Sequence, residues 1–145
     1  MAEFAIDPRL VAATHPLVSL KLSEARLYAD ARWPWILLVP RKVGARELEH
    51  LTTADRAVLM DEIVAAGMAV RAIGAASGRP VEKLNVGAIG NKVEQLHIHI
   101  AGRRPDDPAW PEPVWGFGTA KPYAEADLAT VREAALTAFQ GLKRK

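Results

Sequence analysis

The pattern of apolar and polar side chains changes its period several times along the chain. Residues 16–22 alternate between the two types, and 25–30 follow after a link at Ser23 and Glu24. Alternation is typical of half-buried strands, and the short link favours a hairpin. The next segment, WILLVP at 35–40, is apolar throughout and ends at a proline. This segment predicts a central strand that is buried on both faces.

A helical period begins after this third strand. Apolar residues recur at spacings of three and four from Leu59 to Ile73, and the sequence SGRP then interrupts them. Thr52 and Asp55 can form a capping box at the amino end of this helix. Further along, the pattern predicts two more strands and a second amphipathic helix, over residues 83–90, 95–102 and 124–142.

The order of these elements predicts the fold class. Short links between neighbouring strands favour antiparallel pairing. We therefore expect an α+β fold, with a mainly antiparallel five-stranded sheet, one long helix between strands 3 and 4, and a C-terminal helix. A chain of 145 residues with 50% hydrophobic content can form one well-packed core and is short for two. We expect a single domain over residues 1–145.

Charge, cysteine content and hydropathy argue against several classes of binding partner and site. Nineteen basic against 17 acidic side chains leave a formal charge of +2, which gives no broad field for binding nucleic acid. The absence of cysteine excludes disulfides, thiolate nucleophiles and Cys-ligated metals. No segment approaches the roughly 18 apolar residues of a membrane helix. We expect a soluble, cytoplasmic protein that binds neither nucleic acid nor membranes.

The segment QLHIHIAGRR, at 95–104, carries the candidate chemistry. In an extended strand, Gln95, His97 and His99 share one face, and the intervening apolar side chains share the other. The apolar face would pack on the core and leave the three polar groups on a helix-free side or in a cleft. A lone histidine there would most simply be an ordinary residue of an amphipathic strand, but two in register favour a chemical role.

An imidazole pair at this spacing has two chemical interpretations. It could bind zinc, but such a site needs a third ligand. His15, His50 and Asp30 are the remaining candidates, and alternation directs Glu94 away from the pair. Alternatively, one imidazole attacks phosphorus while neighbouring donors hold the phosphate oxygens.

The residues around the pair suit nucleophilic catalysis. Asn85 offers an amide side chain, and the glycines at 87 and 90 allow a backbone to approach a ligand closely. Positive charge is available nearby from Lys92, Arg103 and Arg104.

These parts, in this order, resemble the histidine triad family, whose signature is His-φ-His-φ-His with φ apolar. LNVGAIGNKVEQLHIHIAGR is similar to the family's Asn-x-Gly strand, glycine turn and motif strand. LLVPRK, at 37–42, is similar to an earlier family strand that ends in Pro and a basic residue. The resemblance covers about residues 17–104, the core of a HIT-like domain. The C-terminal segment and helix at 105–145 align with no family element.

The resemblance implies roles for individual residues. His97 would be the nucleophile that takes the nucleotidyl group, and His99 would contact the phosphate under attack. Gln95 stands where the first histidine of the motif should be, and its amide could orient a neighbour but not titrate. Asn91 stands near a phosphate-contacting glutamine of the family. Lys92 stands near a small hydroxyl residue that assists the leaving group.

Asp30 resembles the ribose-binding Asn or Asp of the family, although an Asp that forms a turn explains this position equally well. The family resemblance implies a nucleotide hydrolase or nucleotidyl transferase without a cofactor or metal. It would act at the α-phosphorus of a nucleoside phosphate conjugate or a dinucleoside polyphosphate, through a nucleotidyl-histidine. The substituted Gln95 favours the alternative of a nucleotide-binding or adaptor protein with little turnover. A metal-dependent hydrolase is the third interpretation.

Two pairs of tryptophans are candidates for packing or ligand contacts, and the second pair and the sheet edges also bear on assembly. Trp33 and Trp35 would share one face, where they either pack or line a base pocket. Trp110 and Trp115 lie in a proline-rich segment and favour a fixed covering loop, which could reach a partner's pocket. Because the resemblance implies pairing and sheet edges must be covered, we expect a homodimer.

Overall fold

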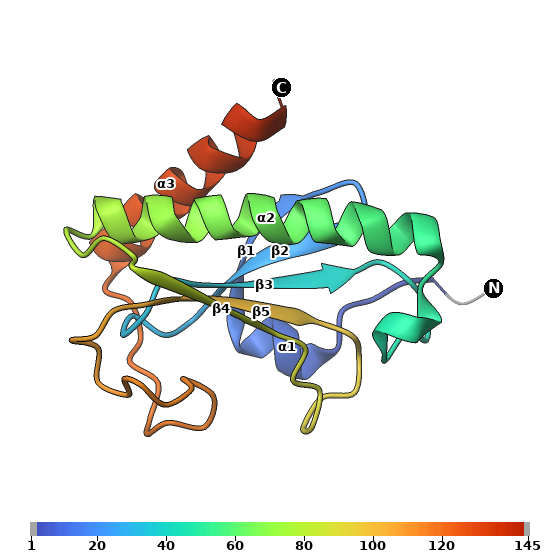
Figure 1. Ribbon diagram of the computed structural model, residues 1–145, viewed down its shortest axis with the longest axis horizontal. Helices are drawn as coiled ribbons and strands as arrows, with labels where there is room; N and C mark the ends of the chain where they lie inside the picture. The colour runs from blue at the N-terminus through green and yellow to red at the C-terminus, as the bar shows by residue number, and fades with distance from the viewer. Residues whose placement is uncertain (1–2, 144–145) are drawn as a thin grey trace.

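The computed structural model describes residues 3–143, which form a five-stranded sheet with a long helix along one face (Figure 1). The strands are β1 (Thr14–Ser19), β2 (Ser23–Tyr28), β3 (Trp35–Pro40), β4 (Lys83–Gly87) and β5 (Ile98–Arg103). The helices are α1 (Pro8–Ala12), α2 (Thr53–Ala76) and α3 (Glu125–Lys143), with a short 3₁₀ turn, η1 (Leu48–His50), before α2. The strand order is β1-β2-β3-β5-β4, and all neighbouring pairs are antiparallel. The predicted α+β fold is confirmed.

Several element boundaries differ from the prediction, and one helix was not predicted. The first hairpin turns at residues 20–22, where the Leu20 amide donates to the Ser23 carbonyl, so β2 already begins at Ser23. The last strand begins at Ile98 rather than at residue 95. The helix α1 was not predicted, although Asp7 caps it and Pro8 occupies its first turn, which are both sequence signals for a helix start.

The main core lies between the sheet and α2. Leu59, Ala66, Val70 and Ile73 of α2 pack against the apolar side chains that β2, β3 and β5 direct toward the helix, and α3 closes this layer. Complete burial of a side chain such as Leu27 contributes about 1.5–3 kcal/mol. Thr52 caps α2 by accepting from the Asp55 amide at 3.1 Å, as the sequence predicted.

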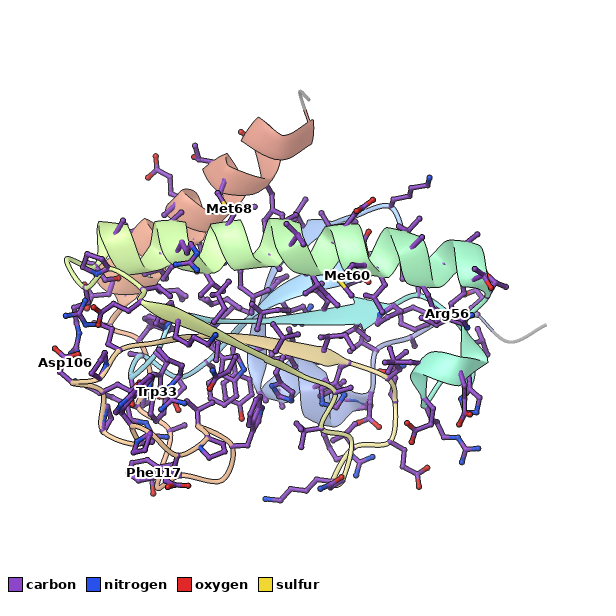
Figure 2. The ribbon with its side chains drawn as sticks, in the orientation of Figure 1. Trp33, Arg56, Met60, Met68, Asp106 and Phe117 are labelled. Atoms are coloured by element: carbon purple, nitrogen blue, oxygen red, sulfur yellow. The ribbon has the colours of Figure 1, made fainter. Side chains whose placement is uncertain are left out.

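The opposite face of the sheet is also covered. Trp33, Trp35, Leu37 and Val39 form a second cluster there with Val114 and other side chains from the amino-terminal segment and the loop after β5. Figure 2 shows Trp33 and Phe117 on this side, away from α2. Every residue of β3 is buried, which confirms the prediction of a central strand that is buried on both faces.

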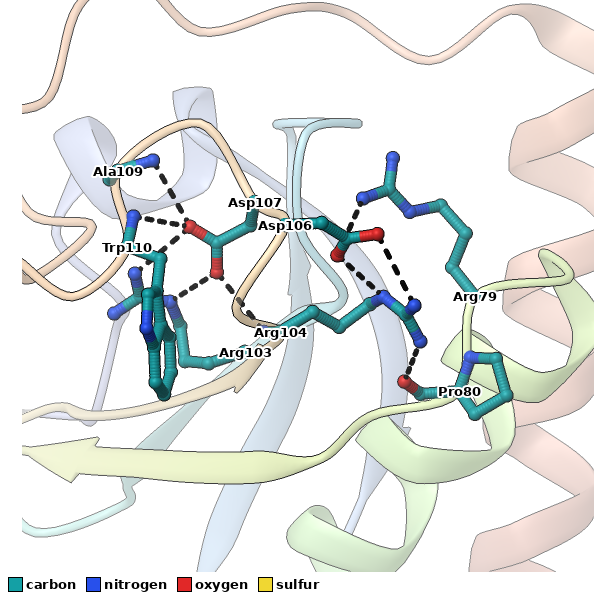
Figure 3. Close-up of polar contacts among 8 residues, drawn as sticks. All are labelled: Arg79, Pro80, Arg103, Arg104, Asp106, Asp107, Ala109 and Trp110. Atoms are coloured by element: carbon teal, nitrogen blue, oxygen red, sulfur yellow. Dashed lines mark hydrogen bonds and ion pairs between the residues drawn. The ribbon is translucent and has the colours of Figure 1, made fainter.

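A buried ion pair fixes the loop after β5, which we call the covering loop (residues 104–118), to the sheet (Figure 3). The Arg103 guanidinium donates to both oxygens of Asp107 at 2.8 and 3.0 Å. Asp107 also accepts from the amides of Arg104, Ala109 and Trp110. Burial alone would raise the pKa of Asp107, but the hydrogen bonds, led by that from Arg103, lower it to about 2. The covering loop is therefore an ordered part of the fold.

None of the helices in residues 3–143 is long and apolar enough to cross a membrane.

Candidate active site around His97 and His99

His99 lies in the middle of the sheet, on the face that the covering loop shields. It is opposite Leu37 of β3 and Gly87 of β4, and its side chain is 6% exposed. The Trp35 indole Nε1 donates to His99 Nδ1 at 3.0 Å. Because Nδ1 accepts this bond, the His99 proton sits on Nε2. Burial, with a smaller contribution from His97, lowers the pKa of His99 to about 3, so the imidazole is neutral.

His97 precedes β5 and is held in the opposite tautomer. Its Nδ1 lies 2.7 Å from the main-chain carbonyl oxygen of Gln95. A carbonyl only accepts, so Nδ1 carries the proton and the lone pair of Nε2 is left for another partner. The His97 side chain is 4% exposed, and its ring centroid is 5.0 Å from that of His99.

Gln95 contributes to this arrangement through its main chain. Its side-chain amide faces the amino-terminal segment, where Oε1 accepts from the Asp7 amide and Nε2 donates to the Ala5 carbonyl, both at 2.8 Å. The side chain therefore ties the amino-terminal segment to the site, and the carbonyl of Gln95 orients His97. The predicted alternation extends ahead of β5: Leu96, Ile98 and Ile100 pack in the main core, and the Gln95 side chain binds the amino-terminal segment, which packs with Trp35 on the opposite face.

A cavity of about 290 Å³ opens beside the two histidines. One wall is apolar and aromatic, and it is formed by Leu10, Tyr28, Trp35, Leu37 and Trp115. Tyr28 stacks on Trp35 with ring centroids 4.0 Å apart, and Trp115 stands edge-on to His99 at 5.6 Å. We call this space the aromatic cavity.

Polar groups line the rim of the aromatic cavity. Asn91 and Lys92 are among them, as the sequence predicted for two residues near the histidines. Arg9 of α1 joins them: its guanidinium donates to the Lys92 carbonyl at 3.0 Å and pairs with Asp7 at 2.9 Å. Arg9 was not predicted from the sequence, although the helix-start signal at Asp7 and Pro8 could have placed it on an ordered element.

A second and larger cavity, of about 610 Å³, lies on the other side of His97. Its lining comes from η1 and from the two segments that flank the glycine turn, and it comprises Arg46, Glu47, Glu49, His50, Ala88, Gly90, Asn91, Glu94, Leu96 and His97. We call it the polar cavity. His97 and Asn91 line both cavities. Alternation had placed Glu94 away from the imidazoles, but it precedes the strand and lines the same cavity as His97.

Two predicted binding residues lie away from the aromatic cavity. Both oxygens of Asp30 accept from the Arg32 guanidinium, and Oδ1 also accepts from the Lys121 amide at 3.3 Å. Asp30 is 1% exposed and joins the end of β2 to the segment before α3. Asn85 Oδ1 accepts from Arg103 Nη1 at 2.8 Å. In this conformation Asp30 and Asn85 are thus engaged elsewhere than at the histidines.

The expectation that Arg103 and Arg104 bring positive charge to the histidines is wrong. Arg103 is 1% exposed and is committed to Asp107. Arg104 pairs with Asp106 at 2.8 Å and donates to the Pro80 carbonyl at the far end of β5 (Figure 3). The basic residues that line the aromatic cavity are Arg9 and Lys92.

The covering loop closes over its own chain. Trp115 lines the aromatic cavity with the His99 of the same chain, whereas Trp110 is 39% exposed and lies against the Arg103 guanidinium. The fixed covering loop expected from these tryptophans is confirmed. Its reach into a partner's pocket stays a prediction.

Within residues 3–143, no group of three or more His, Cys, Asp or Glu side chains is arranged to hold a metal ion.

Known proteins similar to this chain share the motif family. Residues 9–106 match the HIT domain family. A histidine triad protein from Sinorhizobium meliloti 1021 is 40% identical, with 93% of this chain and 96% of that chain covered and a TM-score of 0.84. A histidine triad protein from Marinobacter aquaeolei VT8 is 37% identical, with 97% and 99% covered and a TM-score of 0.87. One from Bradyrhizobium japonicum is 35% identical, with 95% and 99% covered and a TM-score of 0.85. No curated protein sequence matches the chain.

Proposed function

The chain belongs to the histidine triad family, and from this membership we propose that it is a nucleotide hydrolase or nucleotidyl transferase with His97 as its nucleophile. His97 Nε2 attacks the α-phosphorus of a nucleoside phosphate conjugate or a dinucleoside polyphosphate. The Nε2–P bond forms as the bond to the leaving group breaks. Water then hydrolyses the nucleotidyl-His97 and releases the nucleotide.

The observation that carries this proposal is the 2.7 Å contact between His97 Nδ1 and the Gln95 carbonyl. It supports a nucleophilic role because it holds the proton on Nδ1 and leaves the Nε2 lone pair available to phosphorus. The contact also allows the carbonyl to stabilise the positive charge that develops on the ring during attack. Gln95, which we propose occupies the place of the first motif histidine, would assist through this main-chain atom.

His99 would donate from Nε2 to a phosphate oxygen, since Trp35 holds its other nitrogen as an acceptor. Asn91 and Lys92 would bind the remaining phosphate oxygens. The base would lie against Tyr28, Trp35 and Trp115, because nucleobases stack on aromatic side chains. For Asp30 to bind ribose, as the family resemblance implies, it would have to release Arg32. Asn85 would act indirectly, through Arg103 and the covering loop.

One observation favours a second candidate, a nucleotide-binding or adaptor protein with little turnover. The residue in the first motif position is an amide that cannot titrate, and its side chain is bound to Ala5 and Asp7. Such a protein would bind nucleotides in the aromatic cavity without forming a covalent intermediate.

Intact-protein mass spectrometry after incubation with adenosine conjugates separates the two candidates. An enzyme should show a mass increase of one adenylyl group in the wild type and none in His97→Ala, which should still bind AMP. His15→Ala is a matched control, because His15 lies on β1 and lines neither cavity. Turnover that persists in His97→Ala would contradict the mechanism. Binding with neither adduct nor turnover would favour the adaptor.

The homodimer remains a proposal, and two surface features support it. Met60, Val64 and Met68 form an exposed apolar row along α2, at 59%, 62% and 51% exposure. β4 is an edge strand, and α2 passes directly over it, since a Cβ on Gly67 would lie 2.9 Å from Leu84 Cδ1. Antiparallel pairing of two β4 edges would bring the two apolar rows together. It would cover the exposed apolar side chains and also give partners to the unpaired backbone groups of the edge strand.

A further inference from the structure

A third cavity lies at the carboxyl end of β5, away from the histidines. Its volume is about 250 Å³, and it is enclosed by the carboxyl end of α2, the loop after β2, the start of the covering loop and the segment before α3. None of the residues that line it lines the aromatic cavity or the polar cavity. We call it the basic cavity, because its lining includes four cations, Arg32, Arg79, Arg104 and Lys121.

The cations of the basic cavity are only partly balanced by carboxylates. Asp107 also lines the cavity, but the buried Arg103 already neutralises it. Arg79 and Arg104 share a single carboxylate, that of Asp106, at 3.4 and 2.8 Å (Figure 3). The lining therefore keeps an excess of positive charge, and this excess favours an anion as the ligand.

Three of the four cations have donors without a partner among residues 3–143. Arg32 binds Asp30 through Nε and Nη2, which leaves Nη1. Arg79 makes one ion pair through Nη2, to Asp106, and Lys121 Nζ makes none. Guanidinium and ammonium groups bind phosphate oxygens through charge-assisted hydrogen bonds. Because the Arg32 side chain is only 17% exposed, a ligand in the cavity could pair with Nη1 with little competition from water.

The carboxyl end of α2 is capped where it meets the basic cavity. Ser77 donates to the Ile73 carbonyl through both its amide and its hydroxyl, at 3.0 and 2.8 Å. The Arg79 amide donates to the Gly74 carbonyl at 2.9 Å. A helix end carries the equivalent of about half a negative charge, and such caps reduce it. The full charges of the cations therefore outweigh it.

Arg32 also connects the basic cavity to the covering loop. Its guanidinium carbon lies 4.6 Å from the centre of the Trp33 ring and 5.7 Å from that of Phe117. Phe117, near the end of the covering loop, stands edge-on to Trp33. Arg104, at the start of the same loop, lines the cavity with Arg32. A ligand that binds Arg32 and Arg104 together would therefore hold both ends of the covering loop in place.

We propose that the basic cavity is a second binding site, separate from the histidines, for a phosphate dianion, either as the free ion or as the phosphomonoester of a small molecule. The dianion binds the donors of Arg32, Arg79 and Lys121, and it stabilises the covering loop in the conformation that places Trp115 over His99. This inference goes beyond the proposed function and does not depend on nucleotidyl transfer.

Indole ¹⁵N–¹H resonances report which cavity is occupied, since Trp33 lines the basic cavity and Trp115 lines the aromatic cavity. Inorganic phosphate should shift the Trp33 resonance saturably when the ionic strength is kept constant with sodium chloride. Glycerol phosphate tests the second source of the dianion. A saturable Trp33 shift with both compounds shows that the cavity accepts a phosphomonoester, and a shift with inorganic phosphate alone limits the site to the free ion.

A double variant tests the cations. Arg79→Gln/Lys121→Gln should raise the dissociation constant of phosphate, measured at Trp33, by roughly tenfold or more, as expected for the loss of charge-assisted hydrogen bonds. Lys21→Gln/Arg56→Gln is the matched control, because it removes the same two charges from exposed positions outside the cavity and should keep the wild-type constant. Arg56 lies at the opposite end of α2 (Figure 2). All four side chains are exposed, so both variants are expected to fold.

Limited proteolysis measures the effect on the covering loop. If phosphate binds only when the loop is closed, phosphate at about ten times its dissociation constant should slow cleavage within residues 104–118 by roughly tenfold. The same ionic strength of sodium chloride should give no protection.

The site would be overturned by a Trp33 resonance that phosphate does not shift, by a shift that chloride reproduces, or by a dissociation constant that the double variant leaves unchanged. Saturable binding without protection of residues 104–118 would overturn the stabilisation of the loop. None of these measurements requires turnover, so they fail or succeed independently of the His97 adduct.

Discussion

The indole of Trp35 donates to His99 Nδ1 across the pair of strands β3 and β5. The neighbouring His97 has the opposite arrangement, because its Nδ1–H donates to the Gln95 carbonyl. The two imidazoles, with ring centroids 5.0 Å apart, therefore use Nδ1 in opposite senses, one as an acceptor and the other as a donor. One has a free lone pair, which suits a nucleophile, and the other has a free N–H, which suits a donor to the phosphate oxygen.

The first prediction concerns this tautomer of His99. Trp35→Phe keeps an aromatic ring and removes the donor, so His99 should populate both tautomers and kcat should fall about 3–10-fold, the equivalent of one net hydrogen bond. Imidazole ¹⁵N chemical shifts report the tautomer directly. Trp110→Phe, on the exposed part of the covering loop, should change neither quantity. An unchanged His99 tautomer in Trp35→Phe would contradict this role of the indole.

The second prediction concerns stability at acid pH. His99 has a pKa of about 3 in the folded chain against an ordinary 6.5. Between these values the unfolded chain binds more protons, so the free energy of unfolding should fall as pH is lowered from 6.5 to 3 and change little above 6.5. Urea midpoints measured across this range should fall less in His99→Gln than in the wild type. Parallel profiles for the two proteins would show that His99 does not carry this dependence.

Local periodicity explains which parts of the fold the sequence could predict. The apolar run of β3 and the apolar spacing from Leu59 to Ile73 each depend on which side chains of a single element are buried. The structure has the predicted strand and the predicted helix. The same logic predicted that His99 faces away from the main core. It also placed the apolar side chains of Leu96, Ile98 and Ile100 in the core, and the structure has them there although β5 begins only at Ile98.

The chemistry of the site depends on contacts that local patterns do not record. The tautomer of His99 is set by Trp35, 64 positions away. The charge of Arg103 is cancelled by Asp107, whose place depends on the covering loop. Arg9 reaches the cavity rim on an amino-terminal segment that the distant Gln95 binds at Ala5 and Asp7. Sequence could therefore nominate the histidines and Lys92, but not the partner that sets the tautomer of His99 or the presence of Arg9 at the rim.

The third prediction concerns Gln95. Gln95→Leu removes two hydrogen bonds to the amino-terminal segment and leaves the Asp7 amide without its partner, which costs about 1–3 kcal/mol. Because this segment carries Arg9 and Leu10 to the aromatic cavity, KM should rise several-fold while the His97 adduct still forms. Gln95→His, which we propose restores the family motif, should give a folded protein with activity retained or raised. If Gln95→Leu equals the wild type in stability and KM, the side chain has no such role.

The fourth prediction concerns association. Val64→Arg places a charge in the middle of the apolar row on α2 and should disrupt pairing through that face. Light scattering should give twice the chain mass for the wild type and the mass of one chain for the variant. Val43→Arg is a matched control, because Val43 is 60% exposed in the loop after β3. A wild-type monomer, or a dimer that tolerates Val64→Arg, would contradict the proposed interface.

The fifth prediction concerns the covering loop, whose anchor is the pair Arg103 and Asp107. Asp107→Ala leaves the Arg103 charge buried without its carboxylate, and the loss of one partner of a buried pair typically costs about 3–5 kcal/mol. The released loop would withdraw Trp115 from His99, so proteolysis should cut within residues 104–118 and nucleotide affinity should fall. Asp106→Ala is the matched control: Asp106 is in the same loop, its side chain is 61% exposed, and its solvent-screened ion pairs should contribute little to stability. If the two variants proved equally stable and equally resistant to protease, the buried pair would not be what holds Trp115 over the site.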